Sequence, residues 1–181
     1  KGDIRLNNII LCGFMGSGKS TVGKALAQRL GMRFFDSDKQ IESAEHMKIS
    51  DIFGAFGERY FRAAEAAVIK RLSSLDGAVI ATGGGAVLSS ANAAVLRAHG
   101  TVIFLSVSPS TVIERLEGDS TRPLLQRSDR KAAIEQMISE RLPFYKAAAH
   151  FTVDAGGSAD DTVQKIISII APALDIRAQV L

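Results

Sequence analysis

The stretch Gly13-Phe14-Met15-Gly16-Ser17-Gly18-Lys19-Ser20 decides the fold of this chain. It matches the pattern G-x-x-x-x-G-K-[ST], follows the apolar run 9–12 and opens a segment with helical periodicity. In such a strand-to-helix turn the glycines let backbone N–H groups converge on one point, and the helix N-terminus adds positive partial charge. Lys19 supplies a cation for the outer phosphates, and the Ser20 hydroxyl suits Mg²⁺. The alternative is a turn that binds nothing, but motif and context both favour a loop that binds the phosphates of a nucleoside triphosphate.

Beyond this loop, short apolar or β-branched runs alternate with longer segments of helical period. This alternation is typical of βαβ units, so we predict an α/β fold with a central five-stranded parallel sheet. The expected strands are 9–12, 32–35, 78–81, 102–107 and 151–153. The expected helices are 19–30, 38–44, 57–72, 91–98, 109–115, 130–142 and 160–171. Ser108 and Asp129 are candidate helix caps, and 116–128, which fits neither period, is expected to be a mobile surface loop.

The composition is that of an ordinary globular protein, with 46% hydrophobic and 23% charged residues over 181 positions. We expect one domain, residues 1–181. The net charge is +3 and the Lys and Arg residues are scattered, which does not favour nucleic acid as a partner. No segment approaches the roughly 20 apolar residues of a membrane span. The single cysteine, Cys12, is expected to be buried, in a reducing compartment. Residues 1–8 also lack an apolar stretch of signal-peptide length, so we expect a cytoplasmic protein. For its assembly we expect a monomer.

Several residues with functional side chains are interpreted as structural. His46, His99 and His150 are far apart and none has a neighbour at metal-ligand spacing, so we expect surface or helix-end residues and no zinc site. The apolar stripe at 163, 166, 167 and 170 predicts an amphipathic helix that packs on the sheet. The tail after Pro172 is expected to be a docked or frayed terminus.

Two carboxylates follow the second predicted strand, in Phe34-Phe35-Asp36-Ser37-Asp38. A period of two places Asp36 and Asp38 on the same side of an extended chain, at the carboxyl end where open parallel sheets bind ligands. One could help to hold Mg²⁺ and the other could accept a hydrogen bond from an attacking hydroxyl. The alternative is that Asp38 only caps the next helix.

Glycines and arginines complete the candidate site. Thr82-Gly83-Gly84-Gly85 follows the third strand, and three consecutive glycines suggest backbone that passes very close to a ligand. Arg62 has Glu58 four residues before it, so it could form an ordinary exposed pair. Arg141 could be a solvated cation near a helix C-terminus, and Arg122 fits a lid that brings a guanidinium to a transferring phosphate.

Taken together and in this order, these residues resemble the shikimate kinase family. The resemblance runs from the phosphate loop through Asp36-Ser37-Asp38, Gly57-Glu58 to Phe61-Arg62, the glycine triplet, Arg122-Pro123-Leu124-Leu125 and Arg141, and so covers most of the chain. It implies a three-layer P-loop kinase with strand order 2-3-1-4-5 and a lid at about 116–128. It also implies Mg²⁺, ATP as co-substrate and shikimate as acceptor.

The resemblance assigns a role to each candidate residue. The nucleotide contacts would be Gly13, Gly16, Ser17, Gly18, Lys19, Ser20, Thr21, Arg115, Arg122 and Ser158. The Mg²⁺ ligands would be Ser20 and Asp36, and the shikimate contacts would be Asp38, Arg62, Gly83, Gly84, Gly85 and Arg141. Lys19, Asp38 and Arg122 would be the catalytic residues. The segment 155–158 resembles the family's adenine loop, although it lacks the arginine and proline of some members.

The physical chemistry of the residues agrees with a hydroxylated acid as substrate. Guanidinium can donate two parallel hydrogen bonds to a carboxylate, and aspartate accepts hydrogen bonds from hydroxyls. The phosphate loop alone is compatible with hydrolysis, switching or transfer. Two alternatives therefore stay open: a kinase for another small acceptor such as gluconate, and a regulatory module that binds nucleotide without acceptor chemistry.

Overall fold

A five-stranded parallel sheet forms the centre of the molecule, in the order β2-β3-β1-β4-β5. The computed structural model describes residues 7–116 and 130–179. The strands are β1 (Asn8–Cys12), β2 (Arg33–Asp36), β3 (Ala78–Ala81), β4 (Gly100–Ser106) and β5 (Phe151–Asp154). Leu11 of β1 pairs with Ala81 on one side and with Ile103 on the other. The predicted fold class and strand order are confirmed, and β1 lies in the middle of the sheet.

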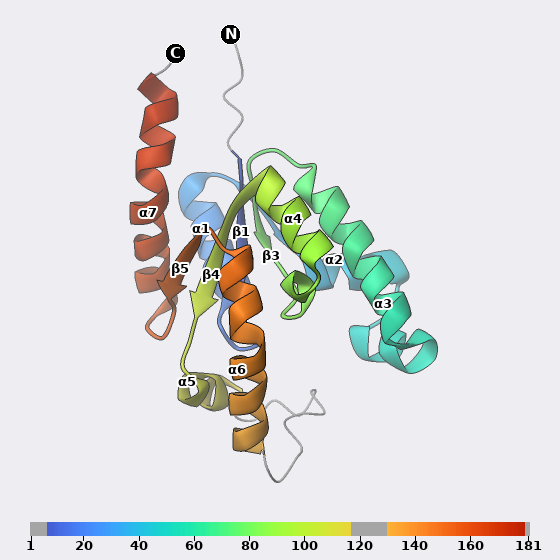
Figure 1. Cartoon of the computed structure of the whole chain (residues 1–181). Helices are drawn as coiled ribbons and strands as arrows, with labels where there is room; N and C mark the ends of the chain where they lie inside the picture. Colours follow the sequence, from blue (N-terminus) through green and yellow to red (C-terminus); the bar gives the residue numbers. More distant parts are fainter. Residues whose placement is uncertain (1–6, 117–129, 180–181) are drawn as a thin grey trace.

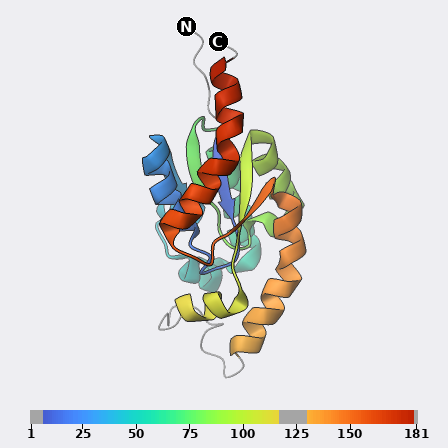
Figure 2. The same ribbon diagram turned by 90° about the vertical axis from the view of Figure 1, so that its left-hand side faces the viewer.

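Helices cover both faces of this sheet (Figure 1). They are α1 (Lys19–Leu30), α2 (Ser37–Glu45), α3 (Ile49–Ser73), α4 (Ser90–His99), α5 (Pro109–Arg115), α6 (Arg130–Ala148) and α7 (Ala159–Gln179), with a short 3-10 turn η1 (Ala86–Leu88). Helices α1 and α7 pack on one face, whereas α3, α4 and α6 pack on the other. Figure 2 shows α7 in front of the sheet with α1 beside it.

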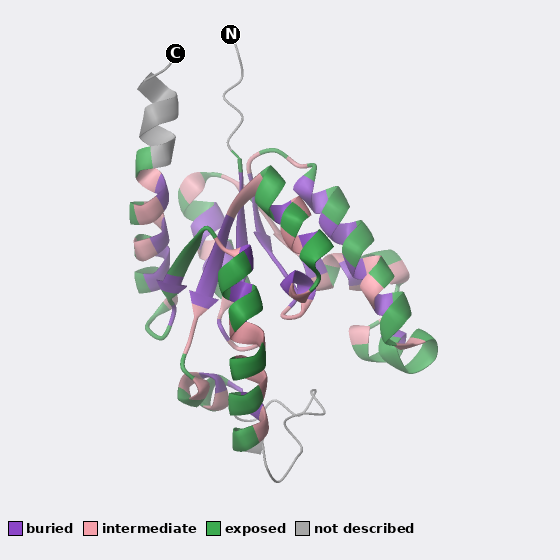
Figure 3. Cartoon of the chain, in the orientation of Figure 1, coloured by how far each residue is buried: buried purple, intermediate pink, exposed green. Residues whose placement is uncertain are grey.

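The central strands β1, β3 and β4 bury both of their faces, because successive side chains point to opposite sides and helices cover each side. Ile9 and Leu11 join the cluster under α1 and α7, and Ile10 and Cys12 join the cluster under α3, α4 and α6. Cys12 is fully buried, as expected. Figure 3 shows the buried central strands between helices whose outer faces are exposed, with the edge strand β5 largely exposed. Burial of each large aliphatic side chain contributes roughly 1.5–3 kcal/mol to folding, so this double core holds the strand ends in place.

The predicted elements are all present, and the bounds of α1, α5 and β3 match those predicted. Ser108 caps α5, because its hydroxyl accepts a hydrogen bond from the Thr111 N–H at 3.1 Å. The expected stripe on α7 is also confirmed, since Val163, Ile166 and Ile170 are buried in the core. The residues 117–129, with the predicted cap Asp129 and the lid residue Arg122, lie outside the described residues.

Three predicted helix bounds were wrong. Helix α3 begins at Ile49 rather than at 57, and Gly57 interrupts it with a φ of 76°. Helix α6 continues past Pro143 to Ala148, and α7 continues past Pro172 to Gln179. Proline disfavours a helix interior, but the buried Tyr145 and Ala148 anchor the last turns of α6 to the core. Arg141 therefore lies inside α6, not in its last turn.

Candidate active site

The phosphate loop connects β1 to α1 at the centre of the carboxyl edge of the sheet. Gly13, Gly16 and Gly18 have φ angles of 148°, 74° and 88°, which side chains rarely allow. At Gly13 a Cβ atom would also lie 2.7 Å from the Leu105 carbonyl oxygen. The Lys19 ammonium folds over the loop and donates to the carbonyl oxygens of Gly13 and Phe14 at 2.9 and 2.8 Å. This places a cation over a concave backbone, the arrangement that phosphate binding requires.

A hydroxyl and a carboxylate meet at the edge of this loop. The Ser20 Oγ donates to Asp36 Oδ2 at 2.5 Å. The other oxygen of Asp36 accepts from the backbone N–H groups of Asp38 and Lys39 at 3.1 and 3.3 Å. Asp36, not Asp38, is therefore the cap of α2, so the capping interpretation of Asp38 was wrong. Two hard oxygen ligands beside a phosphate loop fit Mg²⁺, which is usually held by one or two protein groups and by substrate phosphates.

Asp38 lies in the first turn of α2 and faces the glycine triplet, which we call the Gly83–Gly85 loop. A Cβ atom on Gly83 would collide with Asp38 Oδ1, and one on Gly85 would lie 2.8 Å from Arg62 Nη1. None of the three glycines has a positive φ. Gly83 and Gly85 are thus required by close approach to other side chains of the site, which brings Asp38 and Arg62 to the same loop.

Arg62 projects from α3 and binds two carboxylates. Its Nη2 lies 3.2 Å from Glu58, the exposed pair expected four residues earlier, and its Nη1 lies 2.8 Å from the buried Glu65. Burial raises the pKa of Glu65, and the charge of Arg62 offsets part of that rise. Burial alone would lower the pKa of Arg62, but its hydrogen bonds to Glu65 and Glu58 reverse that effect and raise it. The guanidinium is therefore held in a defined place and stays charged.

Arg141, on α6, lies near the phosphate loop. It is half-buried, and its guanidinium carbon lies 5.9 Å from the centre of the Phe14 ring. This distance is within the range of a cation–π contact. One helical turn later, the buried Tyr145 donates from its hydroxyl to the Gly84 carbonyl oxygen at 2.6 Å. Arg141 thus contacts the phosphate loop through Phe14 and lies inside α6 rather than at its C-terminus.

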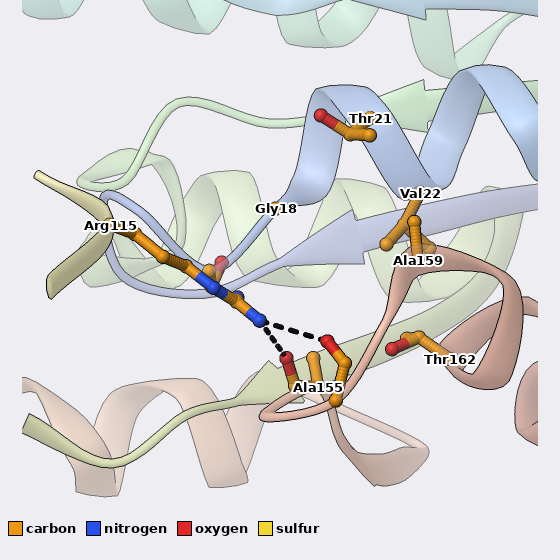
Figure 4. Close-up of a pocket in the computed structure, with 9 residues that line it drawn as sticks. Gly18, Thr21, Val22, Arg115, Ala155, Ala159 and Thr162 are labelled. Atoms are coloured by element: carbon orange, nitrogen blue, oxygen red, sulfur yellow. Dashed lines mark hydrogen bonds between the residues drawn. The ribbon is translucent and has the colours of Figure 1, made fainter. Parts of the chain in front are cut away.

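A cavity of about 240 Å³ opens on the α1 and α7 side of the phosphate loop. Arg115 crosses its mouth and donates to the carbonyl oxygens of Ala155 and Gly157 at 2.9 and 3.0 Å (Figure 4). It also reaches the Gly16 carbonyl oxygen at 3.4 Å. The lining is Ser17, Gly18, Thr21, Val22, Arg115, Ala155, Gly157, Ala159 and Thr162. Ser158, predicted as a nucleotide contact, lies between the lining residues Gly157 and Ala159 and caps α7, because its hydroxyl accepts from the Asp161 N–H.

The structure thus brings together the loop, Asp36, Asp38, Arg62, the Gly83–Gly85 loop and Arg141 at one edge of the sheet, with Arg115 at the adjoining cavity. Sequence reasoning missed Ser37, whose hydroxyl accepts from the Gly83 N–H at 2.8 Å, and also missed Glu65 and Tyr145 as partners. One signal was available for Glu65. It is a charged residue at a core-facing position of α3, four residues after the buried Phe61 and three before the buried Val68.

The three histidines lie where they were expected. His46 follows α2 with a φ of 53°, His99 is the last residue of α4, and His150 lies just after α6. Over residues 7–116 and 130–179, no three His, Cys, Asp or Glu residues gather as a potential metal-binding group. None of the helices in these two ranges has both the length and the apolar character needed to cross a membrane.

Comparison with known proteins identifies the family. A family model described as "SKI: Shikimate kinase" matches residues 15–171. A shikimate kinase of Neisseria meningitidis serogroup C is 43% identical over 159 residues, which are 88% of this chain and 93% of that protein. The structure of a shikimate kinase from Acinetobacter baumannii, in complex with shikimate, is similar with a TM-score of 0.88 and 38% identity, covering 93% and 94% of the two chains. A gluconokinase from Sinorhizobium meliloti, at 20% identity and a TM-score of 0.57, shares the fold alone. The chain therefore belongs to the shikimate kinase family.

Proposed function

We propose that this protein transfers the terminal phosphate of ATP to the 3-hydroxyl of shikimate, giving shikimate 3-phosphate and ADP. The observation that carries the proposal is the meeting of Asp38 and Arg62 on the Gly83–Gly85 loop, directly beside the phosphate loop. A carboxylate and a guanidinium at this spacing can bind a hydroxyl and a carboxylate of one small acid. Membership in the family, and a relative whose structure contains shikimate, support this acceptor.

The nucleotide would bind across the phosphate loop and the adjoining cavity. The backbone N–H groups around Gly16 and Gly18 would surround the phosphates, and Lys19 would exchange its carbonyl partners for phosphate oxygens. Arg115 and Thr21 line the cavity, which would take the base. Ser20 and Asp36 would hold Mg²⁺. When bound, this ion would neutralise charge on the phosphates.

The acceptor would bind on the other side of the Gly83–Gly85 loop. Arg62 and Arg141 would bind the carboxylate of shikimate, because each can donate two parallel hydrogen bonds to it. Asp38 would accept hydrogen bonds from the ring hydroxyls. Arg62 is already held by Glu65 and Glu58, so little side-chain entropy would be lost when the acid binds.

The chemistry of transfer depends mainly on positioning and charge stabilisation. Asp38 would orient the 3-hydroxyl toward the terminal phosphate and accept its proton as the bond to phosphorus forms. Lys19 would stabilise the charge that moves onto the phosphate oxygens. Arg122 would add a second cation from the lid, as the family resemblance implies.

We further propose that the protein acts as a monomer in the cytoplasm, which light scattering and cell fractionation can test.

An ADP-release assay with a panel of acceptors tests this function. Shikimate should stimulate ADP release, whereas gluconate should not, and mass spectrometry should detect shikimate 3-phosphate. Stimulation by gluconate instead would assign the protein to another acceptor. Tight ATP binding by folded protein with no acceptor-dependent ADP release would identify a nucleotide-binding module and refute the proposal.

A further inference from the structure

We propose that Tyr145 is a positioning residue of the acceptor site, which holds the Gly83–Gly85 loop at its working distance from the phosphate loop. The inference rests on the proposed function, because it assigns to Tyr145 an effect on shikimate. It concerns a residue that would not contact either substrate, and whose effect would pass through the backbone of Gly84.

The contacts of Tyr145 fix its side chain in the core and connect it to the Gly83–Gly85 loop. Its side chain is 1% exposed, and its ring stacks on Phe104 with centroids 5.1 Å apart and planes inclined by 14°. Its hydroxyl donates to the Gly84 carbonyl oxygen at the short distance of 2.6 Å. Burial raises the pKa of Tyr145 to about 12, although the nearby Arg141 offsets part of this rise. The phenol therefore keeps its proton, and remains a hydrogen-bond donor, across the physiological pH range.

The Gly83–Gly85 loop needs anchors because glycine backbone loses more conformational freedom on folding than any other. The structure supplies one on each side. Ser37, from α2, accepts a hydrogen bond from the Gly83 N–H at 2.8 Å, and Tyr145, from α6, donates to the Gly84 carbonyl oxygen. The Tyr145 hydrogen bond therefore ties the loop to α6, the helix that also carries Arg141.

The position of Gly84 explains why this anchor would affect function. A Cβ atom placed on Gly84 would lie 3.6 Å from the Met15 nitrogen and 3.8 Å from the Gly13 oxygen, so this glycine packs directly on the phosphate loop. Its neighbours Gly83 and Gly85 touch Asp38 and Arg62. A shift of the Gly84 backbone would change the separation between the acceptor contacts and the phosphates. Misplacement of about 1 Å can cost two orders of magnitude in rate.

The variant Tyr145→Phe tests the inference, because it keeps the ring and its stacking on Phe104 and removes only the hydroxyl. Loss of the hydrogen-bond partner of a buried carbonyl typically reduces the equilibrium population of the conformation that needs this bond by about one order of magnitude or more. We expect the KM for shikimate to rise about tenfold and kcat to fall several-fold, while the KM for ATP stays within about twofold of the parent value. A purely structural effect would instead lower the melting temperature and leave both KM values unchanged.

The chain has two tyrosines, and the other provides a matched control. Tyr60 is exposed, and its hydroxyl donates to Glu45 at 2.7 Å, away from the Gly83–Gly85 loop. Tyr60→Phe should leave all three kinetic constants within twofold of the parent. A second variant, with 4-aminophenylalanine at 145, restores an N–H donor to the Gly84 carbonyl. It should return the KM for shikimate to within about threefold of the parent value.

The outcomes separate this inference from the proposed function. If the parent protein releases ADP with shikimate but Tyr145→Phe has an unchanged KM for shikimate, only the inference fails. An equal rise in the KM for shikimate and the KM for ATP in Tyr145→Phe would also overturn it. So would a tenfold rise in the KM for shikimate in the 4-aminophenylalanine variant. If Tyr145→Phe does not fold, the 4-aminophenylalanine variant alone provides the test. A folded parent without any response to shikimate would overturn both.

Discussion

Replacement of Arg62 by alanine should have two separable consequences, one for stability and one for acceptor binding. Arg62 is 38% exposed, whereas the carboxylate of its partner Glu65 is 2% exposed. Removal of the guanidinium would leave a carboxylate in the interior with its compensating charge gone. It would also remove a group that we propose binds the carboxylate of shikimate.

The expected magnitudes follow from this geometry. Breaking a fully buried ion pair by removal of one partner costs about 3–5 kcal/mol. Arg62 is more than one-third exposed, so solvent screens part of the interaction, and we expect a smaller loss of about 2 kcal/mol. In a chain of this size that loss lowers the melting temperature by about 4–8 °C. A lost charge-assisted contact to the substrate should weaken shikimate binding by about thirtyfold.

The stability lost in Arg62→Ala should depend on pH, and the direction follows from the pKa of Glu65. Burial raises the pKa of Glu65, and the variant lacks the cation that offsets this rise. The folded variant would then hold the Glu65 proton over a pH range in which the unfolded chain has released it. Stability would therefore fall as the pH rises above the usual range for Glu, and the deficit relative to the parent would be larger at pH 7.5 than at pH 5.

A double variant separates the two consequences. In Arg62→Ala/Glu65→Met an unbranched apolar side chain of similar length replaces the carboxylate, so no buried charge remains. Thermal melts should show more than half of the lost stability restored, while calorimetry should show shikimate binding still weakened. A double variant that is no more stable than Arg62→Ala would refute the buried-charge reasoning. An unchanged shikimate affinity in either variant would refute the carboxylate-binding role of Arg62.

Four further predictions concern other parts of the chain. Lys19→Ala should reduce ADP release to background with an unchanged circular dichroism spectrum; turnover near the parent rate would contradict its role. Arg122→Ala should lower kcat more than it changes the KM for shikimate, and equal rates in variant and parent would remove the lid role. His150 accepts from the Val102 N–H through Nδ1 at 3.0 Å, and burial lowers its pKa. The free energy of unfolding, measured in urea, should therefore fall slightly as the pH drops below about 6.5, because the unfolded chain binds a proton at His150 first, whereas His150→Gln should lack this fall. Burial raises the pKa of Cys12 to about 12, so iodoacetamide at pH 8 should modify the thiol only after unfolding.

Much of the fold could be predicted because its signals are local. The turn from 13 to 20 combines a strand, a glycine-rich loop and a helix start within one motif, and the structure confirms the bounds of α1. Helix ends were less predictable where proline was taken as a stop. Pro143 lies inside α6, because the packing of Tyr145 and Ala148 outweighs the lost hydrogen bond.

The candidate site could be predicted in part for a related reason. The phosphate loop, the two aspartates and the glycine triplet follow the carboxyl ends of strands, and parallel strands place those ends at one edge of the sheet, whereas the arginines come from helices. The hydrogen-bond partners of these residues follow no such rule. The contacts made by Glu65, Ser37 and Tyr145 depend on how α3, α2 and α6 pack against the sheet. Local sequence patterns do not predict that packing.

The glycine triplet shows how the two kinds of information combine. Its three glycines suggested backbone close to a ligand, but Gly83 and Gly85 are first of all close to Asp38 and Arg62 of the protein itself. Gly84 differs, because a Cβ atom there would make only ordinary contacts. The loop thus lets an anion and a cation approach the same backbone from two sides while its middle rests on the phosphate loop. Such a loop can bring an acidic acceptor to a phosphate without a side chain between them, and that is the geometry that phosphoryl transfer to a small acid requires.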